Sequence, residues 1–237
     1  MTQFSGTEKI GDVVAHFPGA TEVFRKYKID FCCGGDRPLH QALREQGLNE
    51  QEVLSDLESA WERAAQYRSG QIDWREAPMS ELIDHIVSTH HGYLRNELPA
   101  LSELTMMILR AHGAQHGDTL RQVHKLFHNL KTELEQHLIK EEEMLFPLIK
   151  DYETTNDKAK LDQALKILDE LEAEHEGAGD VLKELRQITG EYAVPADGCP
   201  TYDDTYRRLV RLEEDMFQHI HLENNILHPR LRAEKNN

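Results

Sequence analysis

Two stretches of this 237-residue sequence, HLIKEEEMLFP at 137–147 and HIHLENNILHP at 219–229, repeat one pattern at an offset of 82 residues. Both read His-x3-Glu-x3-Leu-x-Pro, so His137 pairs with Glu141 and His219 pairs with Glu223. Side chains four residues apart lie on one face of an α-helix, so each pair directs an imidazole and a carboxylate toward the same volume. The repeat therefore predicts two helices that each present a histidine and a glutamate to a shared site.

A further histidine precedes each copy at a similar distance. His91 lies 46 residues before His137, and His175 lies 44 residues before His219. All of these groups fall on the apolar sides of their helical patterns, where burying charged or polar side chains without partners is costly. Bound cations would offset this cost of burial, because they favour the ionised carboxylate and the neutral imidazole. The predicted metal ligands are His91, His137, Glu141, His175, His219 and Glu223.

Other histidines compete for these positions, since a single histidine on an apolar stripe is more often a core residue than a ligand. His90 is the main rival of His91, but His91 continues the apolar stripe from Val87 to Leu94. His221 lies between the two ligands of its repeat and is expected to face away. The remaining alternatives are His85, His112, His116, His124, His128 and His228.

The predicted donor set discriminates among metals. Structural zinc sites are usually rich in cysteine or tetrahedral, and calcium and magnesium prefer oxygen ligands. Four imidazoles with two carboxylates on bundle helices suit a pair of iron or manganese ions. The simplest arrangement gives each metal two histidines and uses both glutamates as bridges. The expected cofactor is two non-haem irons with an oxo or hydroxo bridge and open positions for a small molecule.

The surrounding sequence predicts an all-α fold. Apolar residues recur at steps of three and four in four stretches, namely 83–101, 126–148, 161–185 and 209–227. Expected connections lie at 113–118, 154–157 and 195–201. We therefore expect a four-helix bundle over residues 78–235, preceded by a small helical domain over residues 1–70, with a linker around Ser69-Gly70.

Composition narrows the possible partners and location. The net charge of −16 disfavours binding to nucleic acid or to an anionic membrane surface. No apolar run is long enough to span a membrane, and residues 1–12 lack a signal-peptide pattern. Three cysteines give no disulfide framework and fit a reducing compartment. These features predict a cytoplasmic protein.

The small N-terminal domain contains a second chemical motif, CCGG at 32–35. Asp36 can cap a following helix, and cysteines just before a helix tend to have a lowered pKa, so Cys32 and Cys33 are candidates for redox or metal transfer. The competing interpretation is two buried cysteines beside a Gly-Gly turn, and the residues leave both open. Cys199, in a proline-containing loop, is assigned no role.

With these motifs, nearly the whole chain resembles proteins of known families. The bundle resembles the hemerythrin-like superfamily. The segments IGDVV at 10–14 and FRKYKIDFCCGG at 24–35 resemble the short domain that precedes such a bundle in the di-iron proteins of the family named for repair of iron centres. The family's ligands match the six residues predicted above, and its cysteine pair matches Cys32 and Cys33. This sequence departs from the family at His228, where an aromatic residue comparable to Phe146 is usual, and in its histidine-rich stretch at 112–128.

The resemblance implies a bacterial protein that repairs iron-sulfur clusters damaged by nitrosative or oxidative stress, with iron donation as the expected mode. Its implied partners are damaged iron-sulfur proteins or cluster-assembly proteins, and a gaseous ligand such as nitric oxide or oxygen. We expect a monomer or homodimer. Two alternatives remain: reduction of nitric oxide at the di-iron centre, which would make the protein an enzyme, and a hemerythrin-like binding or sensing module for oxygen or nitric oxide.

Overall fold

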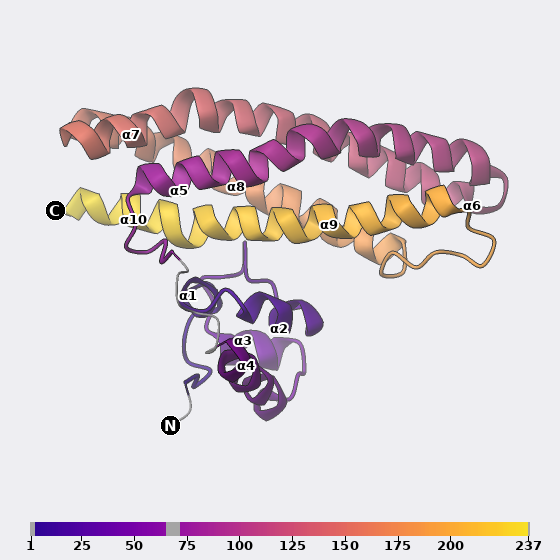
Figure 1. Ribbon diagram of the computed structural model, residues 1–237, viewed down its shortest axis with the longest axis horizontal. Helices are drawn as coiled ribbons and strands as arrows, with labels where there is room; N and C mark the ends of the chain where they lie inside the picture. The colour runs from indigo at the N-terminus through magenta and orange to yellow at the C-terminus, as the bar shows by residue number, and fades with distance from the viewer. Residues whose placement is uncertain (1–2, 65–71, 237) are drawn as a thin grey trace. The chain divides into compact units, whose positions relative to one another are not determined.

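The computed structural model describes residues 3–64 and 72–236, so the predicted linker around Ser69-Gly70 lies outside it. Within the described ranges all regular structure is helical, apart from one isolated β-bridge between Lys9 and Pro38 (Figure 1). The prediction of an all-α fold is therefore confirmed. The chain divides into two compact units. We name Ile83–His219 the bundle unit, and Met1–Leu82 with Ile220–Asn237 the Cys-Cys unit.

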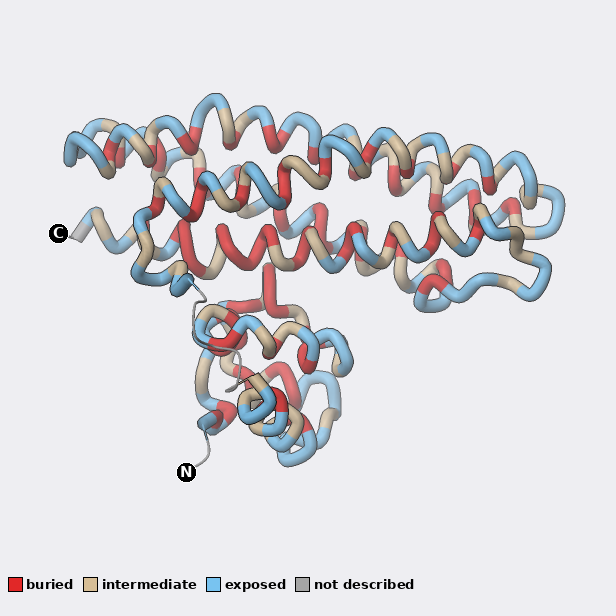
Figure 2. Tube along the Cα trace, viewed as in Figure 1, coloured by how far each residue is buried: buried red, intermediate tan, exposed pale blue. Residues whose placement is uncertain are grey.

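Four helical rods form the bundle unit. Helix α5 (Met79–Ile86) continues through a π-helical turn, η1 (Val87–His91), into α6 (Gly92–Lys140). A second π-helical turn, η2 (Glu141–Leu145), joins α6 to α7 (Phe146–Thr155). Helices α8 (Lys158–Ile188) and α9 (Pro200–Leu222) follow. Figure 2 shows that buried residues recur along one side of these helices, as an amphipathic pattern requires.

Helix α6 supplies two of the rods, because it reverses direction at one residue. His116 has non-helical backbone angles (φ −121°, ψ 19°). Ser102 lies beside His128 and Thr105 beside His124, with hydrogen bonds of 3.4 and 3.1 Å. The residue numbers rise on one side as they fall on the other, so the two arms of α6 are antiparallel. The predicted connection at 113–118 is thus present as a tight turn at His116.

The other two connections fall near their predicted positions. Asn156 ends α7 in the left-handed region with φ of 54°, and the Asp157 side chain caps α8 by accepting from the Ala159 N–H at 2.9 Å. A longer loop separates Ile188 from Pro200. Helix α9 then contacts the first arm of α6 through Arg208 and Glu97 at 2.6 Å.

The Cys-Cys unit contains four short N-terminal helices and the end of the chain. The helices are α1 (Ile10–His16), α2 (Ala20–Lys26), α3 (Leu39–Glu45) and α4 (Glu50–Ala64). The C-terminal part comprises the π-helical turn η3 (Glu223–Leu227), α10 (His228–Ala233) and the short 3-10 turn η4 (Glu234–Asn236). Pro38 occupies the N-cap position of α3, so the expectation that Asp36 caps this helix is wrong.

Candidate metal centre

Three π-helical turns lie at predicted metal ligands. His91 ends η1, Glu141 begins η2, and Glu223 begins η3. A π-helical turn inserts one extra residue and rotates the side chains that follow, and such turns are frequent at functional sites. Proline near the start of α7 and of α10 lacks an N–H, so it cannot continue the α-helical hydrogen bonds through η2 and η3. The Leu-x-Pro part of the repeat is the sequence signal for these turns.

The bundle unit brings five of the predicted ligands together in its core. His91, Glu141 and His219 form one group, and His137, Glu141 and His175 form another; within each group the potential ligand atoms lie within 4.8 Å of one another. All five side chains are buried. We call these residues the five-residue cluster.

Glu141 connects the two groups. Its Oε1 lies 3.0 Å from Nε2 of His137 and 3.8 Å from Nε2 of His175. Its Oε2 lies 3.3 Å from Nε2 of His91 and 4.0 Å from Nε2 of His219. The two oxygens of one carboxylate therefore serve different histidine pairs, which is the geometry of a carboxylate that can bridge two metal ions.

The donor chemistry of the cluster fits a metal. Two Nε2 atoms approach each other within each pair, at 3.2 Å for His91 and His219 and at 2.8 Å for His137 and His175. Two lone pairs directed at one point, beside a buried carboxylate, suit a cation placed among them. Imidazole combined with carboxylate favours iron, manganese or a similar transition metal over calcium or magnesium.

Carboxylates outside the cluster orient two of its histidines. Nδ1 of His91 lies 2.6 Å from Glu142 Oε1, and Arg95 also donates to Glu142 at 2.6 Å. Because the carboxylate accepts, the proton of His91 resides on Nδ1 and the Nε2 lone pair faces the cluster. Partial burial raises the pKa of Glu142, but the hydrogen bonds from Arg95 and His91 outweigh it and leave the pKa lowered.

Glu174 performs the same task for His137. Nδ1 of His137 donates to Glu174 Oε2 at 2.7 Å, and Lys140 donates to both Glu174 and Glu170. Partial burial raises the pKa of Glu174, but the hydrogen bonds from Lys140 and His137 outweigh it and leave the pKa lowered. Glu174 therefore stays ionised at neutral pH and fixes the ring of His137.

Replacing Glu174 with Gln is expected to weaken metal binding by about tenfold or more, because an amide is a poorer acceptor for the Nδ1 proton. Competition with a coloured chelator measures this change. Glu170→Gln is the matched control, since it alters the Lys140 contact and should leave affinity within about twofold. Equal losses in both variants would mean that the charge around Lys140 matters and the histidine hydrogen bond does not.

His90, the rival of His91, has a different environment. Its Nδ1 lies 2.9 Å from Asp215 Oδ1, and its ring stacks on that of His219 with centroids 5.6 Å apart and an interplanar angle of 7°. His90 belongs to neither group of potential ligands within the described residues, whereas His91 belongs to one. The structure thus places His90 beside the cluster and His91 inside it.

His91→Ala is therefore expected to lose much of the bound iron, while His90→Ala keeps nearly all of it. Loss of the His90 contact to Asp215 should lower thermal stability by about 1–3 kcal/mol, because Asp215 then remains half-buried without this partner. Iron content and melting temperature measured on the same preparations separate the two effects. Greater iron loss from His90→Ala would mean that η1 is rotated by one residue.

Glu223, the sixth predicted ligand, follows His219 along one continuous helix. Helix α9 runs through Leu222 directly into η3, and Glu223 is fully buried. Within the sequence repeat it corresponds to Glu141.

Comparisons with known proteins match both parts of the chain. Residues 6–61 match the model of a domain of unknown function, DUF542, and residues 82–231 match the hemerythrin HHE cation binding domain. A probable iron-sulfur cluster repair protein of Haemophilus influenzae is 34% identical over 228 residues, covering 96% of this chain and 98% of that protein. This chain belongs to the iron-sulfur cluster repair protein family.

Other members of the iron-sulfur cluster repair protein family match over a similar span. The iron-sulfur cluster repair protein YtfE of Escherichia coli O17:K52:H18 is 32% identical, covering 95% of this chain and 97% of that protein. YtfE of Enterobacter sp. strain 638 is 33% identical over the same shares. The predicted hemerythrin-like fold is confirmed, and a metal site in its bundle is supported by the buried His and Glu groups. Across the described ranges, no helix combines the length and apolar character needed to cross a membrane.

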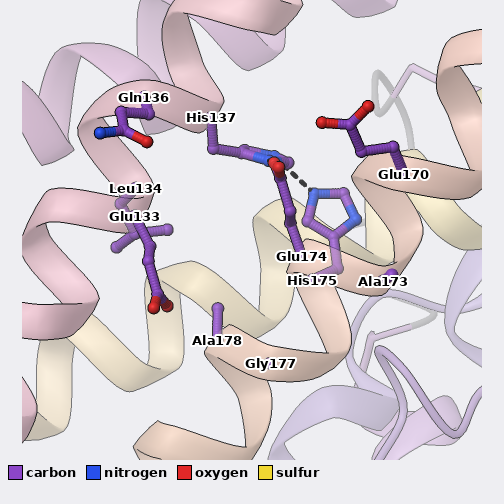
Figure 3. Close-up of a pocket in the computed structure, with 10 residues that line it drawn as sticks. All are labelled: Glu133, Leu134, Gln136, His137, Glu170, Ala173, Glu174, His175, Gly177 and Ala178. Atoms are coloured by element: carbon purple, nitrogen blue, oxygen red, sulfur yellow. Dashed lines mark hydrogen bonds and ion pairs between the residues drawn. The ribbon is translucent and has the colours of Figure 1, made fainter.

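A pocket of about 430 Å³ opens beside the cluster in this family member. Figure 3 shows His137 and His175 facing each other in it, with Glu174 and Glu170 nearby. Glu133 also contributes to the lining. Two potential metal ligands and three carboxylates therefore line the same pocket.

The cysteine pair occupies a tight turn in the Cys-Cys unit. Cys32 is buried, Cys33 is half-buried, and their sulfurs lie 3.6 Å apart without a disulfide. Asp30 Oδ1 accepts from the Cys32 backbone N–H at 3.1 Å and from the Gly34 N–H at 3.2 Å. Burial raises the pKa of Cys32 well above its ordinary value. The prediction of thiolate character is therefore wrong for Cys32, because the turn folds inward and is not exposed at a helix start.

Asn225 holds this turn in place and was not singled out from the sequence. Its side-chain amide donates to the carbonyl oxygens of Phe31 at 3.2 Å and Cys32 at 3.0 Å. A Cβ atom on Gly11 or on Gly35 would lie 2.4 Å from Asn225 Oδ1, so both glycines are needed for this approach. The available signal is one of the differences between the repeats, Glu-Glu after Glu141 but Asn-Asn after Glu223.

Proposed function

We propose that the cluster holds two non-haem irons, one between His91 and His219 and the other between His137 and His175. Glu141 bridges them, and the observation that carries this assignment is the division of its two oxygens between the histidine pairs. Bound iron would supply a redox-active cation that can exchange with other ligands. Glu142 and Glu174 keep the imidazole protons of His91 and His137 on Nδ1, so the metal-binding nitrogen of these two residues faces the cluster.

In this proposal Glu223 is the second bridging ligand. It lies four residues beyond His219 on an unbroken helix, and it occupies the position of Glu141 in the repeat. Its burial supports the role, since a buried carboxylate requires a compensating charge or hydrogen bonds.

We further propose that the protein repairs damaged iron-sulfur clusters by donating iron. The names of its relatives support the repair function, and the pocket beside His137 and His175 supports donation. Carboxylates are suitable oxygen ligands for a departing ferrous ion, and Glu174 links the pocket margin to His137 directly. The recipients would be iron-sulfur proteins in the cytoplasm, a location consistent with three cysteines that form no disulfide.

Transfer of isotopically labelled iron tests this proposal. Protein loaded with ⁵⁷Fe is mixed anaerobically with a dehydratase whose iron-sulfur cluster has been damaged, and the mixture is separated after enzyme activity recovers. We expect the label in the repaired enzyme and a matching loss of iron from the donor. Recovery of activity while all labelled iron stays on this protein would contradict donation.

Replacing both Cys32 and Cys33 with Ser is expected to leave iron content nearly intact and to impair repair. The five-residue cluster lies in the bundle unit, so the cysteines are not needed to assemble it. Because Cys32 is buried, the variant must be checked for thermal stability and iron content in the same preparation. Full repair activity with unchanged iron would remove any functional role for the pair.

A further inference from the structure

The histidine-rich stretch at 112–128 contains two pairs of histidines with a spacing of four residues, and neither pair belongs to the five-residue cluster. His112 and His116 form the first pair, and His124 and His128 form the second. The non-helical backbone at His116 interrupts the first pair, whose ring centroids lie 6.5 Å apart. The second pair lies on the regular second arm of α6, and its ring centroids lie 4.1 Å apart. We call His124 and His128 the second-arm pair.

Two hydroxyl groups on the first arm of α6 each contact one ring of the second-arm pair. The Thr105 hydroxyl donates to the Ser102 carbonyl oxygen at 3.1 Å, so its oxygen accepts from Nδ1 of His124, also at 3.1 Å. The Ser102 hydroxyl oxygen lies 3.4 Å from Nε2 of His128.

These contacts leave one nitrogen of each ring available. Nε2 of His124 and Nδ1 of His128 have no hydrogen-bond partner among the described residues, since each hydroxyl contacts the opposite nitrogen. A histidine that binds a metal usually donates its other ring N–H to an oxygen, and this contact fixes the orientation of the ring. Thr105 and Ser102 provide such oxygens to the second-arm pair, as Glu142 does to His91 in the cluster.

Local charges favour a neutral ring at His124. Partial burial lowers the pKa of His124, and the neighbouring His128 ring lowers it further. A proton therefore competes weakly with a metal ion for this ring at neutral pH. Lys131, three residues beyond His128, forms an ion pair with Glu135 at 2.7 Å, so its positive charge is compensated. The net charge of −16 on the whole chain also attracts cations.

We propose that His124 and His128 together bind a divalent late transition-metal ion, in a site separate from the five-residue cluster. Two imidazoles favour metals such as zinc and copper over magnesium and calcium, which prefer oxygen ligands. His128 lies nine residues before His137 on α6 (137 minus 128), which at 1.5 Å per residue is about 14 Å. The two sites therefore share no ligand.

A metal ion at the second-arm pair exchanges readily with solvent. Two protein ligands leave the remaining coordination positions to water, so binding is weaker than in a site with three or four protein ligands. Both rings are half-exposed, so the ion reaches them without passing through the core of the bundle. Affinity should follow the general order of the first-row metals, with copper bound more tightly than nickel or zinc. Such a site takes up and returns free metal ions and does not hold a permanent cofactor.

Equilibrium dialysis of the full chain against Zn²⁺ tests the proposal, with the metal that the protein holds after purification left in place. We expect the wild-type chain to take up about one further zinc. His124→Gln and His128→Gln each remove one imidazole and should weaken this uptake by at least about tenfold. Because both side chains are half-exposed, the melting temperature without added zinc should change little in either variant.

Thr105→Val distinguishes a metal site from two histidines that only touch each other. Valine has nearly the shape of threonine but cannot accept the Nδ1 proton of His124, so zinc affinity should fall about tenfold although both imidazoles remain. Electron paramagnetic resonance after addition of less than one equivalent of Cu²⁺ gives a second signature. We expect coupling to two imidazole nitrogens in the wild-type chain and to one in His128→Gln.

His116→Gln is the matched control, because it removes a histidine of the same stretch whose ring lies apart from its partner. It should leave zinc uptake within about twofold of wild type. Absence of a further zinc in the wild-type chain, full uptake by His124→Gln, or an equal loss in His116→Gln would overturn the proposal. Iron measured in the same samples should not change, and a loss of iron in His124→Gln would contradict the separation of the two sites.

Discussion

Glu141→Ala is expected to lose nearly all bound iron, from both positions of the proposed centre. One oxygen of this carboxylate lies beside His137 and the other beside His91, so removing it takes a ligand from each metal. Without metal, the variant should unfold no more easily than the wild-type chain, because a buried carboxylate is itself unfavourable.

Melting temperatures with and without iron reveal this pattern. The wild-type chain should gain stability on iron binding through mass action, and Glu141→Ala should gain almost none. Glu143→Ala is the matched control, since Glu143 lies in the same acidic run but is exposed. A Glu141→Ala variant that retains about half its iron would show that each metal is held without a shared carboxylate.

Gly35→Ala is expected to destabilise the Cys-Cys unit by about 1–3 kcal/mol or more, through overpacking. The added Cβ would lie 2.4 Å from Asn225 Oδ1 and 2.8 Å from the backbone oxygen of Phe31, and the backbone atom cannot move aside cheaply. The substitution should therefore disrupt the packing of Asn225 against the turn that contains Cys32 and Cys33.

Urea unfolding monitored by tryptophan fluorescence measures this effect selectively, because Trp61 and Trp74, the only tryptophans, both belong to the Cys-Cys unit. Gly177→Ala provides the control: a Cβ at Gly177 meets nothing within 4 Å, and alanine favours the α8 helix by up to about 1 kcal/mol. If Gly35→Ala proves as stable as wild type, the Asn225 contact does not constrain the turn in solution.

The residues of the proposed metal centre can be found from sequence because they obey a local rule. Spacings of four residues, repeated twice on apolar stripes, are enough to pair His137 with Glu141, and the stripe around His91 favours it over His90. Helical periodicity needs only neighbouring residues, so the all-α fold follows from the same information.

The features that sequence reasoning missed depend on contacts between distant segments. Glu174 differs from other acidic residues of α8 only because α8 places it beside His137. The pKa of Cys32 is raised because the turn folds inward, and that of Cys199 is lowered by His112, 87 residues earlier in the chain (199 minus 112). Periodicity also assumes a uniform helix, so it did not reveal the π-helical turns at His91 and Glu141.

Metal counting combined with Mössbauer spectroscopy on anaerobically purified protein tests the central claim most directly. The six proposed ligands predict about two irons per chain and a signal from two non-haem sites, both lost in Glu141→Ala. One tightly bound zinc per chain, with no iron, would contradict the di-iron centre.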